Sequence, residues 1–371
     1  MRRTKMGNET INIIIAGGGT GGHIFPALAI AAALKKINPK VEVLFVGAKG
    51  KMEMERIPDA GYKIIGLDIA GYNRSSLIKN IALPYKLLKS YFQVKNILKS
   101  FRPEAVVGVG GYSSFPVLRL AQTRNIPTFI HESNSLAGKS NIMLGKRAEA
   151  IFVASEGMEK YFPANKILLT GNPIRDIFSK KISREEALSF FGLKPDFKTV
   201  FVMGGSLGAK SINETIEDNI DFFKKNNLQL IWQTGKNFSA KAAKAEEERT
   251  NMWTNAFISK MEYAYAAADV VIARAGAMTI AEMCVVKKAA IFVPFPFAAE
   301  DHQTVNAEAL VNRNAALLVP DAEVKNKLMP ALLNLIKDDN KINVLENNIV
   351  ALGNTNADEK IAREILNIIN K

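Results

Sequence analysis

Three histidines occur in the 371-residue sequence, and the first of them closes a glycine-rich run. The run is Gly17-Gly18-Gly19-Thr20-Gly21-Gly22-His23, and it lies between the apolar residues 11–16 and a helical pattern at residues 26–34. Glycine has no Cβ, so such a turn lets the backbone approach an anion at the start of a helix. We therefore expect the functional site at this junction between strand and helix. A tight turn with His23 lining the first helical turn remains the alternative.

The glycine run matches a dinucleotide-binding fingerprint only loosely. Gly17, Gly19 and Gly22 have the GxGxxG spacing, but that fingerprint also needs an acidic residue about 20 residues further on. The next apolar segment, residues 41–46, ends in Gly47-Ala48-Lys49 instead. A P-loop is excluded, because no Gly-Lys-Ser/Thr follows the run.

The other two histidines also lie in polar clusters that follow predicted strands. The clusters are His131-Glu132-Ser133-Asn134 and Glu300-Asp301-His302-Gln303. Ligands of open α/β sheets bind outside the carboxyl ends of the strands, so both clusters are candidate sites. A further glycine turn occurs at residues 108–111.

A nucleotide-sugar site is indicated by residues 274–282, whose sequence is RAGAMTIAE. A helix that begins near Ala277 to Thr279 would offer amide donors to a diphosphate. Glu282, one turn into that helix, could accept hydrogen bonds from two ribose hydroxyls, although a capping or surface carboxylate is the simpler alternative. The sequence contains no HxxE or DxD pair, so we expect no metal and no cofactor.

Length and composition favour a soluble protein with two α/β domains. The net charge of +13 lies entirely in residues 1–172, because residues 173–371 are balanced. This asymmetry predicts an anionic partner for the first half, unless the lysines only solvate its surface. The single cysteine, Cys284, excludes an internal disulfide and fits a reducing compartment. No apolar stretch is long enough to span a membrane, and no secretory signal is recognisable.

Short apolar runs alternate with helical patterns, which predicts parallel sheets. The second half repeats the pattern of the first, since residues 199–203 also lead into a glycine turn, GGSLGA. We expect domains at residues 1–172 and 173–356, with a helix at 357–369 within a terminal segment, 357–371, that could pack back on the first domain. The predicted strands are residues 11–16, 41–46, 63–67, 105–109, 128–131, 150–154, 167–170, 199–203, 228–232, 256–258, 270–273, 289–293 and 316–319.

Residues 75–101 interleave apolar residues with five lysines and contain no acidic residue. A helix of this composition, interrupted at Pro84, is suited to lie on anionic lipid. A core-facing helix with its lysines in water is an equal alternative.

Seven motifs, in order along nearly the whole chain, resemble the MurG family of bacterial N-acetylglucosaminyltransferases. They are GGGTGGHIFPALAIA, GVGGYSSFP, HESNSLAGKSN, TGNPIR, GGSLGAKSIN, FISKMEYAYAAADVVIARAGAMTIAE and VPFPFAAEDHQTVNA. The chain departs from the family pattern at Phe115, where a glycine is often found, and at Phe297-Ala298-Ala299, which leaves the placement of Gln303 open.

The resemblance implies the GT-B fold, in which two Rossmann-like domains face each other across a cleft. It implies inverting transfer of N-acetylglucosamine from UDP-N-acetylglucosamine to the C4 hydroxyl of the muramyl sugar of lipid I, giving lipid II for peptidoglycan. The implied donor contacts are Thr20, Gly21, Gly22, Asn134, Arg175, Ser206, Ile258, Ala277, Met278, Thr279, Ile280, Ala281, Glu282 and Gln303. His23, Tyr112 and Glu132 match positions on the acceptor side.

Inverting transfer needs a base, and we expect His23 to be that base, with Glu132 as the second candidate. The anionic partner of the first half is then the lipid pyrophosphate and an acidic membrane surface, not nucleic acid. The protein is expected at the cytoplasmic face of the bacterial inner membrane, as a peripheral protein. The alternatives are another GT-B enzyme, such as a UDP-N-acetylglucosamine 2-epimerase, and a non-catalytic nucleotide-sugar-binding subunit.

Overall fold

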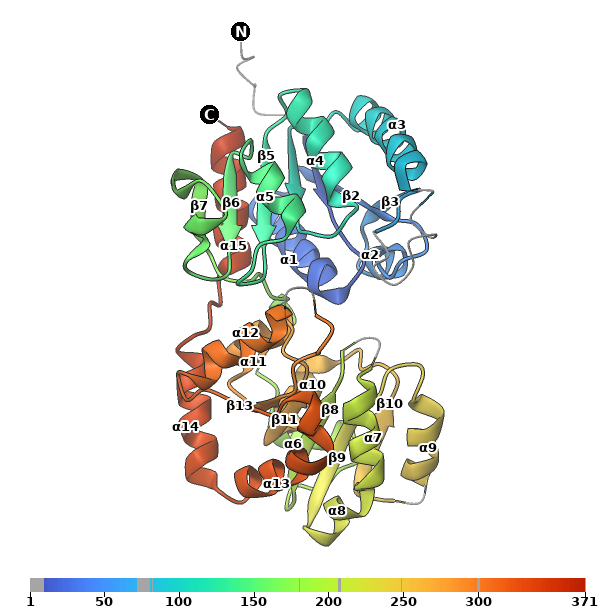
Figure 1. Ribbon diagram of the computed structural model, residues 1–371, viewed down its shortest axis with the longest axis vertical. Coiled ribbons are helices and arrows are strands. Elements are labelled where there is room, and N and C mark those ends of the chain that lie inside the picture. Colours follow the sequence, from blue (N-terminus) through green and yellow to red (C-terminus); the bar gives the residue numbers. More distant parts are fainter. Residues whose placement is uncertain are drawn as a thin grey trace. The chain divides into compact units, whose positions relative to one another are not determined.

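The computed structural model describes residues 10–71, 81, 83–179, 181–205, 208–247, 249–298 and 301–370. The chain forms two compact units, shown in Figure 1. Unit 1 comprises Met1–Arg175 and Thr355–Lys371, and unit 2 comprises Asp176–Asn354. Three parts of the sequence-based predictions lie outside the described residues. They are the donor contact Ser206, Glu300 of the polar cluster, and residues 75–80 of the lysine-rich segment.

In the described part of unit 1, seven parallel strands form one sheet with the order β3-β2-β1-β4-β5-β6-β7. The strands are β1 (Ile11–Ala16), β2 (Val41–Ala48), β3 (Lys63–Leu67), β4 (Ala105–Gly108), β5 (Thr128–Glu132), β6 (Ala150–Val153) and β7 (Ile167–Leu169). The helices are α1 (Gly21–Ile37), α2 (Glu53–Asp59), α3 (Leu83–Phe101), α4 (Ser114–Thr123), α5 (Lys139–Gly145) and α15 (Ala357–Ile369).

Helices cover both faces of this sheet, which explains why its strands are nearly continuous apolar runs. Alternate residues of β1 point to opposite faces: Ile13 and Ile15 pack with α1, α2 and α15, whereas Ile14 and Ala16 pack with α3, α4 and α5. The terminal helix α15 lies among the elements of unit 1 (Figure 1). Its residues Ile361 and Ile365 are fully buried in the same cluster as the apolar face of α1.

In the described part of unit 2, six parallel strands have the order β10-β9-β8-β11-β12-β13. The strands are β8 (Lys198–Met203), β9 (Leu228–Gln233), β10 (Met252–Asn255), β11 (Val270–Ala273), β12 (Ala289–Phe292) and β13 (Leu317–Leu318). The helices are α6 (Arg184–Phe190), α7 (Lys210–Asp218), α8 (Ile220–Lys225), α9 (Ser239–Glu247), α10 (Met261–Ala267), α11 (Ala277–Val286), α12 (His302–Val311), α13 (Val324–Ile336) and α14 (Asp339–Val350).

Two sequence-based boundaries were wrong. The strand predicted at residues 256–258 lies instead at β10, four residues earlier, because an edge strand tolerates the polar residues Thr254 and Asn255. The helix predicted from Pro26 begins at Gly21. The two glycines conceal the start of this helix in the sequence, because glycine is a poor helix former. Gly21, Gly22 and His23 therefore belong to α1, and Pro84 likewise lies in the first turn of α3.

The strand order of each sheet reverses at one point. In unit 1 the chain leaves β1 toward β2 on one side and later returns to β4 on the other. In unit 2 the same reversal occurs between β8 and β11. The loops at such a switch point diverge and leave a crevice at the carboxyl ends of the strands, where open α/β sheets bind ligands.

Candidate active site

His23 lies at the switch point of unit 1, in the first turn of α1, and is half-buried. Its Nδ1 lies 3.0 Å from the carbonyl oxygen of Gly18. A carbonyl oxygen can only accept, so Nδ1 carries the proton and donates it. In the neutral imidazole the basic lone pair is then on Nε2.

The loop that follows β4 packs closely on His23. Gly110 has φ +95°, and a Cβ at this position would lie 2.7 Å from Nε2 of His23, so only glycine fits. Tyr112 follows in the same loop, and its hydroxyl is buried with no hydrogen-bond partner among the described residues. Burial, and secondarily the charge of Glu53, raise the pKa of Tyr112. An unsatisfied buried hydroxyl next to the glycine run is consistent with a ligand-binding role.

Glu53 was missed by the sequence analysis, although it is the acidic partner of the glycine run. It begins α2, is 1% exposed, and accepts hydrogen bonds from the backbone N–H groups of Gly19 at 2.8 Å and Ala48 at 3.0 Å. The dinucleotide-binding fingerprint predicts an acidic residue about 20 residues beyond the run, whereas Glu53 lies 34 residues beyond Gly19.

Glu132, the second candidate base, ends β5 and is 4% exposed. Its Oε1 accepts from the backbone N–H and the side-chain amide of Asn134, and its Oε2 accepts from the Gly138 N–H and the Asn141 side chain. Four donors hold this carboxylate in one orientation. This geometry makes Glu132 the organiser of the loop after β5 and orients Asn134.

His131 is fully buried in β5, and its Nε2 has no hydrogen-bond partner among the described residues. Burial lowers the pKa of His131 to about 4, and the positive charge of His23 lowers it further, against the opposing effect of a backbone hydrogen bond with Gly171. The imidazole is therefore neutral in the folded protein at neutral pH.

The low pKa of His131 predicts acid sensitivity. Between pH 6.5 and about 4 the unfolded chain binds a proton at this position and the folded chain does not, so stability falls as the pH falls through that range. The expected loss is on the order of 3 kcal/mol. Urea unfolding followed by circular dichroism at pH 7 and 4.5 measures it, and His131→Asn should flatten the difference. Parallel pH dependences of the two proteins would contradict this assignment.

Arg175 packs on the first helix of unit 1, since its guanidinium carbon lies 4.4 Å from the centre of the Phe25 ring. This cation–π contact places its positive charge against the same helix that carries His23. Thr20, the residue before α1, is exposed and makes no side-chain hydrogen bond to that helix.

In unit 2, the predicted helix N-terminus is α11, which follows β11 at the switch point. Gly276 precedes it, no side chain caps it, and its first turn contains no acidic residue. Ala277, Met278 and Thr279 form this turn, and Ile280 and Ala281 continue it toward Glu282. The amides of the first turn suit an anionic ligand.

Glu282 is 7% exposed, and its Oε2 accepts a hydrogen bond from the Tyr265 hydroxyl at 2.8 Å. The alternative that Glu282 is a surface carboxylate is therefore excluded. Tyr265 is itself 1% exposed and fixes the orientation of the carboxylate, a role that the sequence analysis did not detect.

Gln233, also undetected, ends β9 and connects two loops. Its Oε1 accepts from the Ile258 N–H at 2.9 Å, and its Nε2 donates to the Gly205 carbonyl at 3.3 Å. Ile258 lies beyond the end of β10, at the carboxyl edge of the sheet, and is buried. Gln233 therefore positions the loop that carries Ile258, a predicted donor contact.

Arg274 anchors the loop before α11. It donates to the carbonyls of Val293 and Pro294, to Asp321 at 2.5 Å and to the Ser211 hydroxyl at 3.0 Å. Gln303, in α12, accepts from the Phe295 N–H at 3.0 Å, which holds the loop after β12.

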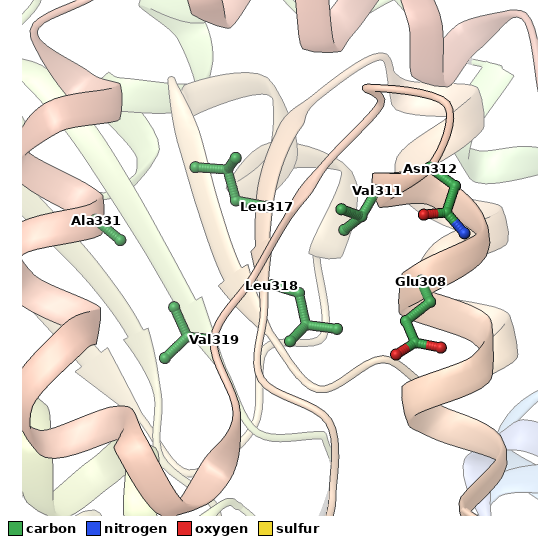
Figure 2. A pocket seen from close by; sticks show the side chains of 7 residues that line it. All are labelled: Glu308, Val311, Asn312, Leu317, Leu318, Val319 and Ala331. Carbon is green, nitrogen blue, oxygen red and sulfur yellow. The ribbon is translucent and has the colours of Figure 1, made fainter.

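An open groove of about 570 Å³ lies elsewhere in unit 2, beside the edge strand β13 (Figure 2). Its lining residues are Glu308, Val311, Asn312, Leu317, Leu318, Val319 and Ala331. None of them is a predicted donor contact, and none is cationic, so the groove has no cationic partner for a diphosphate.

Within the described ranges, no group of three or more His, Cys, Asp or Glu side chains is arranged to hold a metal ion. In the same part of the chain, no helix combines the length and hydropathy that a membrane span needs.

The two parallel-sheet units, with polar side chains and helix N-termini at their switch points, define the GT-B class of glycosyltransferases, as expected. A crystal structure of MurG from Acinetobacter baumannii is similar over 96% of this chain and 99% of that chain, with a TM-score of 0.75 and 28% identity. A UDP-N-acetylglucosamine 2-epimerase structure has a TM-score of 0.65 at 12% identity over 97% of both chains, which is a likeness of fold alone.

The chain belongs to glycosyltransferase family 28, as the models of both family domains match it. The N-terminal domain model matches residues 13–153 and the C-terminal domain model matches residues 199–365. Two relatives are named UDP-N-acetylglucosamine–N-acetylmuramyl-(pentapeptide) pyrophosphoryl-undecaprenol N-acetylglucosamine transferase. The one from Bacteroides fragilis is 48% identical over 97% of this chain and 96% of its own length. The one from Parabacteroides distasonis is 47% identical over 97% and 98%.

Proposed function

We propose that this enzyme transfers N-acetylglucosamine from UDP-N-acetylglucosamine to the C4 hydroxyl of the muramyl sugar of lipid I, with inversion, as the seven motifs in its sequence imply. The observation that carries the proposal is 48% identity over nearly the full length to transferases named for this reaction. The positions of His23 and of the first turn of α11 at the switch points of the two units support it, because open α/β sheets bind ligands there.

The donor nucleotide is proposed to bind unit 2. Amides in the first turn of α11 stabilise its diphosphate, Glu282 accepts from the ribose hydroxyls, and the loop at Ile258 contacts the uracil. The charge that develops on the departing UDP is stabilised by the same amides and by Arg175. The remaining proposed donor contacts are Thr20, Gly21, Gly22, Asn134, Ser206 and Gln303.

His23 is proposed as the base. Nδ1 is committed to the Gly18 carbonyl, so Nε2 takes the proton of the acceptor hydroxyl as that oxygen attacks the sugar. The four hydrogen bonds that hold Glu132 favour His23 over Glu132 for this step. Glu132 and Tyr112 are proposed to serve the acceptor side.

Release of UDP tests the reaction against its alternatives. A transferase should release UDP only when a lipid I analogue is added. An epimerase should convert the donor without any acceptor, and a binding subunit should release nothing. Acceptor-independent consumption of UDP-N-acetylglucosamine would contradict the proposal.

Membrane docking is proposed for the exposed first half of α3. Apolar side chains there face solvent: Tyr85 is 69% exposed, Leu88 58% and Phe92 60%. Lys86 and Lys89 are exposed beside them, whereas Val94 and Leu98, further along, are buried. The sequence left open whether this segment faces lipid or the core. The first half of α3 is exposed and the second half packs in the core, so each alternative describes one half of the helix. An apolar tip flanked by lysines suits an anionic bilayer surface, and we place the enzyme at the cytoplasmic face of the inner membrane.

Replacement of Leu88 and Phe92 by serine is expected to weaken binding to phosphatidylglycerol vesicles by about tenfold or more, since each loses about 1–2 kcal/mol of apolar burial. Cosedimentation measures the effect. The matched control replaces Val344 and Val350 of α14, which are 41% and 42% exposed in unit 2. If both double variants bound the vesicles equally well, α3 would not be the docking surface.

A further inference from the structure

A single peptide unit connects a buried carboxylate to His23. The N–H of Gly19 donates to Oε2 of Glu53 at 2.8 Å, and the carbonyl of Gly18, in the same peptide unit, accepts from Nδ1 of His23 at 3.0 Å. Hydrogen bonds in series polarise one another, so the negative charge of Glu53 strengthens the carbonyl as an acceptor. The carboxylate therefore acts on the imidazole without touching it.

The contact between Glu53 and the glycine run is closely fitted. Gly18 has φ +146°, and a Cβ there would lie 2.3 Å from Oε1 of Glu53. The second oxygen contact, from the Ala48 N–H at 3.0 Å, fixes the carboxylate against the end of β2. With 1% exposure the carboxylate is shielded from water, which keeps its field on the loop strong.

We infer that Glu53 is a positioning residue for His23, acting through the Gly18–Gly19 peptide. It keeps the proton on Nδ1, so that Nε2 is the basic nitrogen, and it stabilises the imidazolium that forms when Nε2 takes the proton of the acceptor hydroxyl. No proton passes through the peptide. The catalytic part of this inference rests on the proposed role of His23 as the base.

Nitrogen-15 NMR of histidine-labelled protein tests the inference directly. The chain has three histidines, and the His23 signals are assigned by their loss in His23→Ala. The wild type should show the neutral tautomer with the proton on Nδ1. Glu53→Gln should give a mixture of tautomers, and its kcat should fall by about 10–100-fold with little change in KM, because a hydrogen bond to a charged group is weakened. Glu53→Asp, which keeps the charge, should retain the Nδ1 tautomer.

Glu55→Gln is the matched control, because it removes the same charge from an exposed position two residues further along α2. It should leave the tautomer and kcat as in the wild type. An Nε2-protonated tautomer in the wild type would overturn the inference, even if Glu53→Gln did not fold. An unchanged tautomer and kcat in a folded Glu53→Gln protein would also overturn it. Full activity of His23→Ala would instead refute the assigned base, whatever the tautomer.

Discussion

Replacement of His23 by alanine is expected to lower kcat for sugar transfer by about 10²–10⁴-fold, the usual contribution of a general base. The expectation follows from geometry, since the Gly18 carbonyl fixes the proton on Nδ1 and leaves Nε2 basic. His23→Gln should lose as much, because an amide cannot take a proton at neutral pH. Steady-state turnover of a lipid I analogue measures both variants.

The control for His23→Ala is the affinity of the same variant for UDP, measured by calorimetry. His23 is proposed to act on the acceptor hydroxyl and is not among the proposed donor contacts, so this affinity should not change. A thermal unfolding curve checks the fold. Near-normal turnover by a folded variant would rule out His23 as the base and would favour Glu132, the second candidate.

Replacement of Glu282 by glutamine is expected to weaken UDP binding by about 10–100-fold. Hydrogen bonds from a neutral donor to a buried carboxylate are worth about 1.5–3 kcal/mol, and the ribose hydroxyls are the proposed donors. Tyr265→Phe, which removes the hydroxyl that orients this carboxylate, should weaken binding by a smaller factor, about 2–10-fold. Calorimetric titration with UDP measures both changes.

Titration with 2′-deoxy-UDP identifies the contact. The wild type should bind the deoxy nucleotide less tightly than UDP, and Glu282→Gln should bind the two more nearly equally. Glu308→Gln is the control, because it removes an exposed carboxylate of unit 2 that is not a predicted donor contact. If Glu282→Gln discriminated between UDP and its deoxy analogue as well as the wild type does, the ribose contact would be wrong.

The buried strands were predictable from the sequence, since strands covered on both faces are continuous apolar runs. The bounds of β1, β3 and β11 match the predicted residues. The edge strand β10 was predicted at the wrong residues, because its polar residues interrupt the apolar run that marks a buried strand. The helix α15 was also predicted at its observed residues, from its own amphipathic sequence.

The residues that orient the site could not be predicted in the same way. Glu53, Gln233 and Arg274 each make at least one hydrogen bond to a group 25 to 47 residues away in the sequence, and only the fold brings these partners together. The glycine run and the RAGAMTIAE segment were recognisable because their chemistry is local. A turn without Cβ atoms and a helix N-terminus each lie within a few consecutive residues.

The position and configuration of the glycosidic linkage in the product test the proposed reaction. The enzyme is incubated with UDP-N-acetylglucosamine and a lipid I analogue, and the product is analysed by NMR. We expect a disaccharide in which N-acetylglucosamine is joined to the muramyl C4 oxygen with the anomeric centre inverted, in the β configuration. A retained α linkage, attachment at another oxygen, or epimerised donor without any disaccharide would contradict it.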